Sequence, residues 1–167
     1  MIRTGKLDAN AAVEDGPYPF FTCSREIFAI DKYAFDCEAI LLAGNNAVGD
    51  FNVNHYKGKF NAYQRTYVIT VNEQKRVLYR FLYFQILKSL KKFKDQSVGA
   101  GTKFLKLGMI NDLEIALPSV AEQERIVSIM DAVREQTQRL ATIYQQKLAA
   151  LDELKKSLLH QAFSGQL

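Results

Sequence analysis

The sequence has few of the residues that build metal centres and disulfide frameworks. Its 167 residues include two cysteines, Cys23 and Cys37, and two histidines, His55 and His160. These four residues are scattered along the chain and form no metal-ligand spacing. We therefore expect two free thiols in a reduced, cytoplasmic protein that binds neither a metal nor a cofactor.

Long apolar runs are also missing. No stretch approaches the roughly 20 consecutive apolar residues that a membrane span needs, and the first ten residues, MIRTGKLDAN, contain no signal-peptide core. Hydrophobic residues make up 48% of the chain and charged residues 24%, which is typical of a globular protein. We expect no membrane partner.

The motifs of common enzyme classes are absent as well. In ILLAGNNAVGDF (40–51) two glycines bracket four residues, but Asp50 and Phe51 stand where a phosphate-binding Walker loop requires Lys and Ser or Thr. A strand followed by a Gly/Asn turn explains this stretch better. There is also no G-x-S-x-G, no H-E-x-x-H and no Asn/Asp-Pro-Pro-aromatic motif. We predict that the chain is not an enzyme, and we keep a small nuclease as an alternative.

Proline and glycine almost disappear from the last third of the chain. No proline follows Pro118, and the next glycine is Gly165. In SVAEQERIV, Ser119 is suited to cap a helix with Glu122 as its capping-box partner. We predict one helix over 121–163, about 64 Å long at 1.5 Å per residue, and a division of the chain into 1–117 and 118–167.

An apolar seam with a heptad period runs along this helix. One heptad position holds Ile126, Val133, Leu140, Lys147 and Leu154, and the other holds Met130, Thr137, Tyr144, Leu151 and Leu158. Eight of these ten residues are apolar or aromatic, as in a coiled coil. Because the chain has no second long heptad segment, we predict a homodimer through this helix. A lone amphipathic helix lying on its own domain is the alternative.

The pattern of residues 1–117 predicts a mixed α/β domain, so the whole chain is α+β. Strands are expected in three aromatic or β-branched runs: 18–24, 38–44 and 64–71. The stretch 57–63 reads as a turn, 75–93 as a buried helix, and 105–118 as a turn and a final strand.

Positive charge is concentrated in the middle of the chain. The net charge is +4, yet residues 75–106 hold nine Lys or Arg against one acidic residue, Asp95. Such a segment favours a polyanionic partner or forms a solvated helix face, and the charge alone does not decide between them.

Side chains suited to reading DNA surround this segment. Asn and Gln recognise adenine and Arg and Lys recognise guanine, whereas hydroxyls and basic groups hold phosphates. The predicted DNA contacts are Lys6, Asn45, Asn46, Lys59, Asn61, Tyr63, Arg65 and Lys103. Asn45 and Asn46 have an equally simple alternative role, which is to shape the turn.

Several stretches resemble one known family. TGKLDANAAVEDGPYPFFTC (4–23), GKFNAYQRTYVI (58–69), TKFLKLG (102–108), LPSVAEQERIV (117–127) and KLAALDELKKSLLHQAFSGQL (147–167) are similar to the specificity subunit of type I restriction–modification enzymes. The resemblance implies that the globular domain reads one half of a split site in double-stranded DNA. It also implies that the long helix is a spacer that docks separate modification (methyltransferase) and restriction subunits.

The chain departs from that family in its size. The usual subunit has two recognition domains and two long helices that pair antiparallel, whereas this chain has one of each and is expected to begin at or inside what would be the first strand of the family's recognition domain. The resemblance therefore implies an antiparallel homodimer that restores the two-domain arrangement and reads an interrupted palindrome. The alternative is an assembly remnant that dimerises, or competes for modification subunits, without binding DNA.

Overall fold

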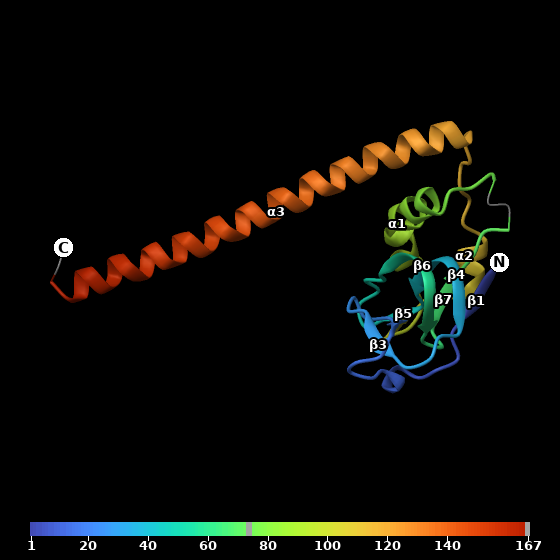
Figure 1. Ribbon diagram of the computed structural model, residues 1–167, viewed down its shortest axis with the longest axis horizontal. Helices are drawn as coiled ribbons and strands as arrows, with labels where there is room; N and C mark the ends of the chain where they lie inside the picture. The colour runs from blue at the N-terminus through green and yellow to red at the C-terminus, as the bar shows by residue number, and fades with distance from the viewer. Residues whose placement is uncertain (73–74, 166–167) are drawn as a thin grey trace. The chain divides into compact units, whose positions relative to one another are not determined.

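The computed structural model describes residues 1–72 and 75–165, in two compact units, Met1–Val127 and Ser128–Leu167. The elements in chain order are β1 (Ile2–Thr4), η1 (Ala9–Ala11), β2 (Tyr18–Phe21), β3 (Phe28–Ile30), β4 (Phe35–Ala43), β5 (Asn45–Asn46), β6 (Val53–Ala62), β7 (Thr66–Ile69), α1 (Tyr79–Gln96), β8 (Lys103–Phe104), α2 (Leu107–Asn111) and α3 (Val120–Phe163) (Figure 1). A sheet with separate helices and a long C-terminal helix confirms the α+β prediction.

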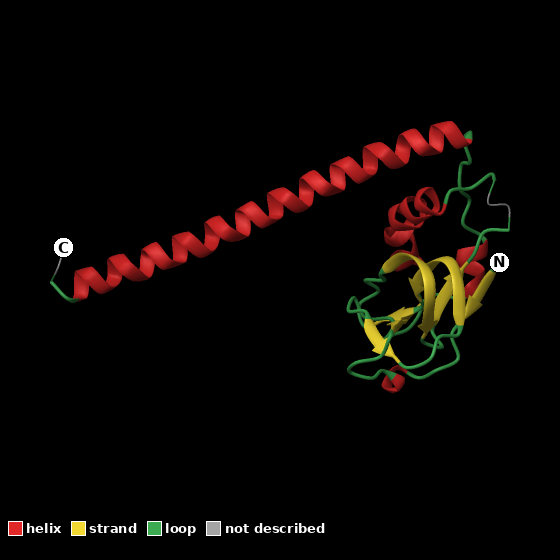
Figure 2. Cartoon of the chain, in the orientation of Figure 1, coloured by secondary structure: helices red, strands yellow, loops and turns green. Residues whose placement is uncertain are grey.

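The first unit is built on a six-stranded sheet with the order β1-β7-β4-β6-β2-β3. Its central strand β4 is antiparallel to both β6 and β7, while β2 pairs with β6 in parallel. Figure 2 shows these strands as a curved layer with α1 beside it. The alternation of side chains along β4 sends Ile40 and Leu42 to the face covered by α1, and Ala39 and Leu41 to the other face.

Each face of the sheet carries its own apolar cluster. On the α1 side, Ile40 and Leu42 pack with Phe84, Ile86 and Phe93 of the helix. On the other side the core is largely aromatic: the rings of Phe21, Phe35, Tyr56 and Phe60 form four contacts with centroid distances of 5.1–5.7 Å.

Two local predictions are wrong, and the reason is tertiary pairing. Residues 57–63 do not form a turn, because β6 continues through them and pairs with β4, with Lys57 opposite Glu38 and Phe60 opposite Phe35. Gly58 meets this requirement with φ of 136°, a value that other residues rarely adopt. The expected final strand within 105–118 is also absent, since residues 107–111 form α2 and bury Ile110 in the core.

The start of α3 is tied to the start of α1 by one buried side chain. Gln123 is 0% exposed. Its amide nitrogen donates to the carbonyl oxygens of Arg76 (2.8 Å) and Pro118 (2.9 Å), and its amide oxygen accepts from the Leu78 N–H (3.0 Å). Because Leu78 is the N-cap of α1 and provides no capping side chain, Gln123 supplies the cap from another helix.

The predicted helix over 121–163 is confirmed. It begins at Val120, and the Glu122 N–H donates to the Ser119 hydroxyl (3.3 Å) as a capping serine requires. The Glu122 carboxylate bonds to Arg125 (2.8 and 2.9 Å), which lowers the pKa of Glu122. From Ser128 onward nearly all described side chains of the helix are exposed. Among the described residues, no helix has the length and apolarity to cross a membrane.

We predict that Gln123→Ala lowers the free energy of unfolding by about 2–4 kcal/mol, because it leaves a buried N–H and two buried carbonyl groups without their partner. Chemical denaturation followed by circular dichroism measures this loss. Gln145→Ala is the matched control, since Gln145 lies exposed on the same helix, and its stability should stay within about 0.5 kcal/mol of the original. An equal loss in both variants would contradict the capping role.

Candidate nucleic-acid interface

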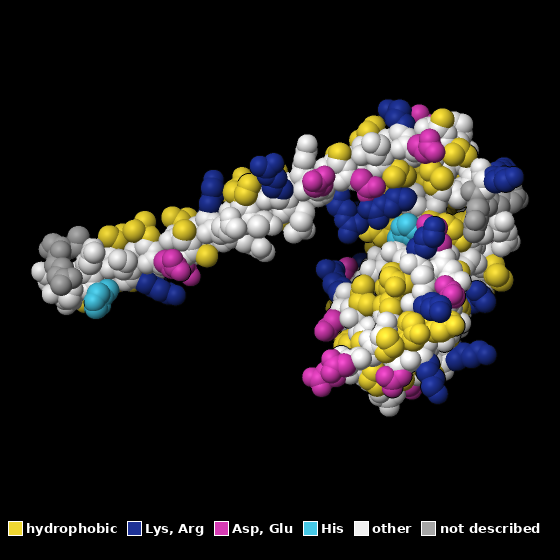
Figure 3. Space-filling view, in the orientation of Figure 1, with side chains coloured by type: hydrophobic (Ala, Val, Ile, Leu, Met, Phe, Trp, Pro, Cys, Tyr) yellow, Lys and Arg dark blue, Asp and Glu magenta, His cyan; other side chains and the backbone are white. Residues whose placement is uncertain are grey.

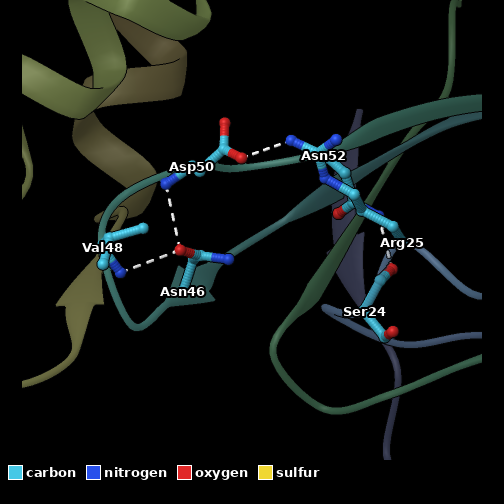
Figure 4. Close-up of polar contacts among 6 residues, drawn as sticks. All are labelled: Ser24, Arg25, Asn46, Val48, Asp50 and Asn52. Atoms are coloured by element: carbon cyan, nitrogen blue, oxygen red, sulfur yellow. Dashed lines mark hydrogen bonds and ion pairs between the residues drawn. The ribbon is translucent and has the colours of Figure 1, made fainter. Parts of the chain in front are cut away.

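Two loops of the first unit are joined by polar contacts, and we call residues 22–27 and 44–52 the loop pair. Figure 4 shows the contacts between them. The Asp50 carboxylate forms an ion pair with the Arg25 guanidinium, and the Asn52 side-chain amide donates to the Ser24 carbonyl. The side chains of Arg25 and Asp50 are 77% and 55% exposed, so the guanidinium is accessible to a partner.

The second loop owes its shape to Asn46. The side-chain oxygen of Asn46 accepts hydrogen bonds from the N–H groups of Val48 (2.9 Å) and Asp50 (3.0 Å), an Asx-type closure. Gly49 has φ of 74°, which allows the chain to reverse at that point. For Asn46 the turn-shaping role is therefore visible, while its amide nitrogen points away from the turn in Figure 4.

Asn45 and Asn46 lie in a short strand that precedes the turn. They form β5, which pairs with β8 so that Asn45 lies opposite Phe104 and Asn46 opposite Lys103. The side-chain oxygen of Asn45 is buried and has no hydrogen-bond partner among the described residues.

The small sheet of β5 and β8 is anchored to the main sheet through Gly44 and Tyr67. The Gly44 N–H donates to the Arg65 carbonyl, and the Gly44 carbonyl accepts from the Leu105 N–H, both at 2.8 Å. A Cβ atom at Gly44 would lie 2.2 Å from the Arg65 oxygen, so this close approach requires glycine. The Tyr67 hydroxyl donates to the Leu105 carbonyl (2.9 Å). Burial raises the pKa of the Tyr67 hydroxyl, and the nearby Cys23 raises it further.

The anchoring brings several of the predicted contact residues to one edge of the unit. Arg65 lies on the β6–β7 turn with its guanidinium 5.1 Å from the centre of the Phe104 ring, next to β5. Lys103 lies opposite Asn46, and the side chains of Lys103 and Lys94 both reach Gly49: a Cβ there would be 3.5 and 3.1 Å from their Cγ atoms. We call Asn45, Asn46, Arg65, Lys94 and Lys103, together with the loop pair, the polar edge.

Tyr63 lies next to Arg65 on the β6–β7 turn, and the segment that follows β1, with Lys6, runs beside this turn. Leu7 and Tyr63 form a parallel bridge, and the Gln64 N–H donates to the Leu7 carbonyl (2.9 Å). Lys6 is exposed and precedes that bridge. We include Lys6 and Tyr63 in the polar edge, which therefore runs from β8 to the segment after β1.

The remaining two predicted contacts lie elsewhere. The Lys59 ammonium is 4.8 Å from the centre of the Tyr33 ring, which packs edge-on against Tyr18. Asn61 is only 5% exposed. Its amide donates to the Lys32 carbonyl (2.8 Å) and accepts from the Ala62 N–H (2.9 Å), so both ends of its amide have partners inside the protein.

Arg25, Asp50 and Lys94 belong to the polar edge but escaped the sequence-based prediction. In the sequence, Asp50 served only as an argument against a phosphate-binding loop. No residue near Arg25 indicated that its side chain would meet Asp50. The basic segment did contain Lys94. Figure 3 shows Lys and Arg side chains gathered near α1, whose exposed lysines are Lys88, Lys91, Lys92 and Lys94.

The described part of the chain shows no cluster of three or more His, Cys, Asp or Glu residues that could hold a metal ion. Cys23 and Cys37 are both free and partly buried. Burial raises the pKa of the Cys37 thiol, with opposing but smaller effects from Arg3 and Asp36.

We predict that Asn46→Ala destabilises the protein by about 1–2 kcal/mol, because the Val48 and Asp50 N–H groups lose their acceptor. Asn46→Asp keeps an oxygen acceptor in the same place and is the matched control, with near-original stability expected. Thermal and denaturant unfolding of both variants checks this. If Asn46→Asp were as unstable as Asn46→Ala, the turn-shaping role of the side-chain oxygen would be wrong.

The comparisons with known proteins agree with this fold. Residues 2–149 match the family model described as the type I restriction modification DNA specificity domain. The chain is also 40% identical over 166 residues to the EcoDI specificity subunit of a type I restriction enzyme from Escherichia coli. The match covers 99% of this chain but 36% of that relative, so the chain spans about a third of its length.

Solved structures of specificity subunits share the fold at low sequence identity. The S subunit from M. genitalium superposes with a TM-score of 0.71 at 16% identity, over 85% of this chain and 38% of that one. A structure described as the basis of complex assembly and conformational transition of the type I R-M system gives 0.76 at 17% identity, over 99% and 44%. The HsdS subunit from Thermoanaerobacter tengcongensis gives 0.64 at 17% identity, over 99% and 42%.

Proposed function

The chain belongs to the family of type I restriction modification DNA specificity domains, and from this premise we propose that it reads one half of a split site in double-stranded DNA. The observation that carries the proposal is the family match over residues 2–149, which includes the whole polar edge. Because the relatives are named as specificity subunits, the prediction of a non-catalytic chain agrees with its family.

The polar edge offers both kinds of contact that DNA recognition needs. Lys94, Lys103 and Lys6 provide ammonium groups for phosphates. Arg25 and Arg65 provide planar guanidinium groups, which bind guanine in a bidentate manner, and the amide nitrogen of Asn46 suits an acceptor on a base edge. The ion pair with Asp50 limits the positions that the Arg25 side chain adopts. This favours recognition of a particular base over non-specific attraction to phosphates.

Asp50 also indicates what the loop pair does in this proposal, which is to orient Arg25. Exposed ion pairs add little stability, so the pair with Arg25 is better explained by orientation than by folding energy. Lys59 remains a proposed contact on a separate surface. Asn61 would reach DNA only by giving up its internal hydrogen bonds, so its proposed contribution is to hold the Lys32 loop against β6.

We further propose that two chains pair through α3 and restore the two-domain form of a specificity subunit. The chain spans 36–44% of its full-length relatives, and the seam residues of α3 are largely exposed. The proposed assembly docks modification (methyltransferase) and restriction subunits, and its two-fold symmetry would read an interrupted palindrome.

A second candidate function uses the helix alone. An assembly protein that dimerises and occupies modification subunits without contacting DNA would also explain the exposed seam. Loss of all DNA affinity in a reconstituted complex, with intact assembly, would favour this candidate.

We predict that two substitutions on the polar edge separate phosphate contact from base reading. Lys103→Ala should weaken binding to all duplexes and reduce the slope of log affinity against log salt by about 1. Arg25→Lys keeps the charge but loses the planar fork, so it should keep the salt slope and lose about 1–3 kcal/mol of discrimination at one base pair.

The experiment uses the chain reconstituted with a type I modification subunit and duplexes selected from a random pool, followed by fluorescence anisotropy across a salt series. Arg139→Ala is the control for charge removal, because Arg139 is exposed on α3. A melting curve for each variant excludes unfolding. If Arg139→Ala weakened binding as much as Lys103→Ala, the polar edge would not be the DNA surface.

A further inference from the structure

The structure and the spacing of polar residues in α3 point to a single register for the proposed dimer. We propose that two copies of α3 pair antiparallel about a two-fold axis beside residue 142, so that Thr137 of each chain lies opposite Lys147 of the other. This inference rests on the proposed homodimer and adds which residues meet across it.

The surface available for pairing is wider than the ten predicted seam residues. Of the seam, Leu140, Tyr144 and Leu151 are 53%, 62% and 61% exposed. Beside it, the large apolar residues Ile129, Ile143 and Leu148 are exposed as well. In heptad terms these three flank the seam, where a coiled coil covers them with its partner helix.

In an antiparallel pair, residues at one heptad position of the seam face residues at the other heptad position of the partner helix. The two helices can therefore shift relative to each other only by whole heptads. With the axis beside residue 142, all apolar seam residues meet apolar ones. The facing pairs are Ile126 with Leu158, Met130 with Leu154, Val133 with Leu151, and Leu140 with Tyr144. The two polar interruptions, Thr137 and Lys147, are left to face each other.

The chemistry of Thr137 and Lys147 is complementary. The Thr137 hydroxyl donates its hydrogen to the Val133 carbonyl of its own helix (2.8 Å), so its oxygen remains available as an acceptor. A lysine ammonium has three donors and no acceptor. The Lys147 ammonium lies 5.9 Å from the centre of the ring of its seam neighbour Tyr144.

A shift by one heptad in either direction removes this match. One shift places Lys147 opposite Met130 and Thr137 opposite Leu140. The other shift places Lys147 opposite Tyr144 and Thr137 opposite Leu154. Both bury a polar group against an apolar side chain, which is unfavourable without a hydrogen bond.

Two further features favour the same register. Residue 142 lies close to the middle of α3 (Val120–Phe163), so the helices overlap along nearly their full length. At the positions that flank the seam, Ile143 of one chain lies beside Ile143 of the other, and Ala141 lies beside Ala141. Arg134 and Lys155 lie beside Leu148 and Val127, so these flanking cations do not face each other.

Engineered cysteines test the register while leaving Thr137 and Lys147 in place. The background is the full chain with Cys23→Ala and Cys37→Ala, checked for dimer mass by light scattering. Three double variants share Val133→Cys. Leu151→Cys reports the proposed register, and Tyr144→Cys and Leu158→Cys report the two shifted registers. Within one helix, residues 133 and 151 are about 27 Å apart at 1.5 Å per residue, so any disulfide joins two chains.

We expect mild oxidation to convert V133C/L151C largely to a covalent dimer, and V133C/Y144C and V133C/L158C to remain largely monomeric on a denaturing gel. Preferential linkage of either shifted variant would overturn the register but leave the dimer standing. Linkage of V133C alone would show a parallel pair and overturn the antiparallel arrangement.

Two outcomes separate this inference from the proposed function. A scattering mass of one chain would remove the dimer itself, whereas DNA reading with a modification subunit would still be measurable. A dimeric mass with no linkage in any variant would place the contact outside the α3 seam and overturn the inference.

Finally, Thr137→Leu with Lys147→Leu should raise linkage of the shifted variants relative to V133C/L151C, because the polar match that selects one register is gone.

Discussion

The buried amide of Gln123 is the interaction on which the arrangement of the first unit depends. One side chain completes the first turn of α1, holds the carbonyl of Pro118 just before α3, and occupies a position with 0% exposure. The segment between Leu113 and Ser119 has no regular structure of its own, so its end needs such a fixed point. With α1 held there, its apolar side covers the sheet, and the opposite side presents the lysines that border the polar edge.

The polar edge is assembled from segments that are distant in the chain. The loop pair, the β6–β7 turn and β8 meet because Gly44 permits a very close approach of the Arg65 carbonyl and because Tyr67 holds Leu105. Acidic Asp50 lies among these basic groups and forms an ion pair with Arg25. The planar guanidinium of Arg25 is thereby held by a carboxylate while most of its surface stays exposed.

The polar residues within the seam of α3 bear on a different question, which is how the proposed dimer selects one register. A seam made only of leucine and isoleucine would stabilise many registers almost equally, whereas a few polar positions disfavour all but one. In the proposed dimer, Thr137 and Lys147 have this effect at some cost in stability. In the proposed dimer the register sets the spacing of the two globular units, so a defined register matters more there than maximal helix affinity.

The sequence by itself determined the features that depend on local pattern. The length of α3 follows from the absence of Pro and Gly after Pro118, its seam from the heptad period, and the buried strand β4 from a continuous apolar run. Tertiary structure alone decided which residues meet. Lys57–Phe60 became part of β6 because β4 offered a paired strand, Asn46 became a turn acceptor, Asn61 was taken into the interior, and Arg25 was joined to Asp50 across the fold. Hydrophobic periodicity is a property of neighbours in the chain, whereas the partner of a polar group depends on which segments the folded core brings together.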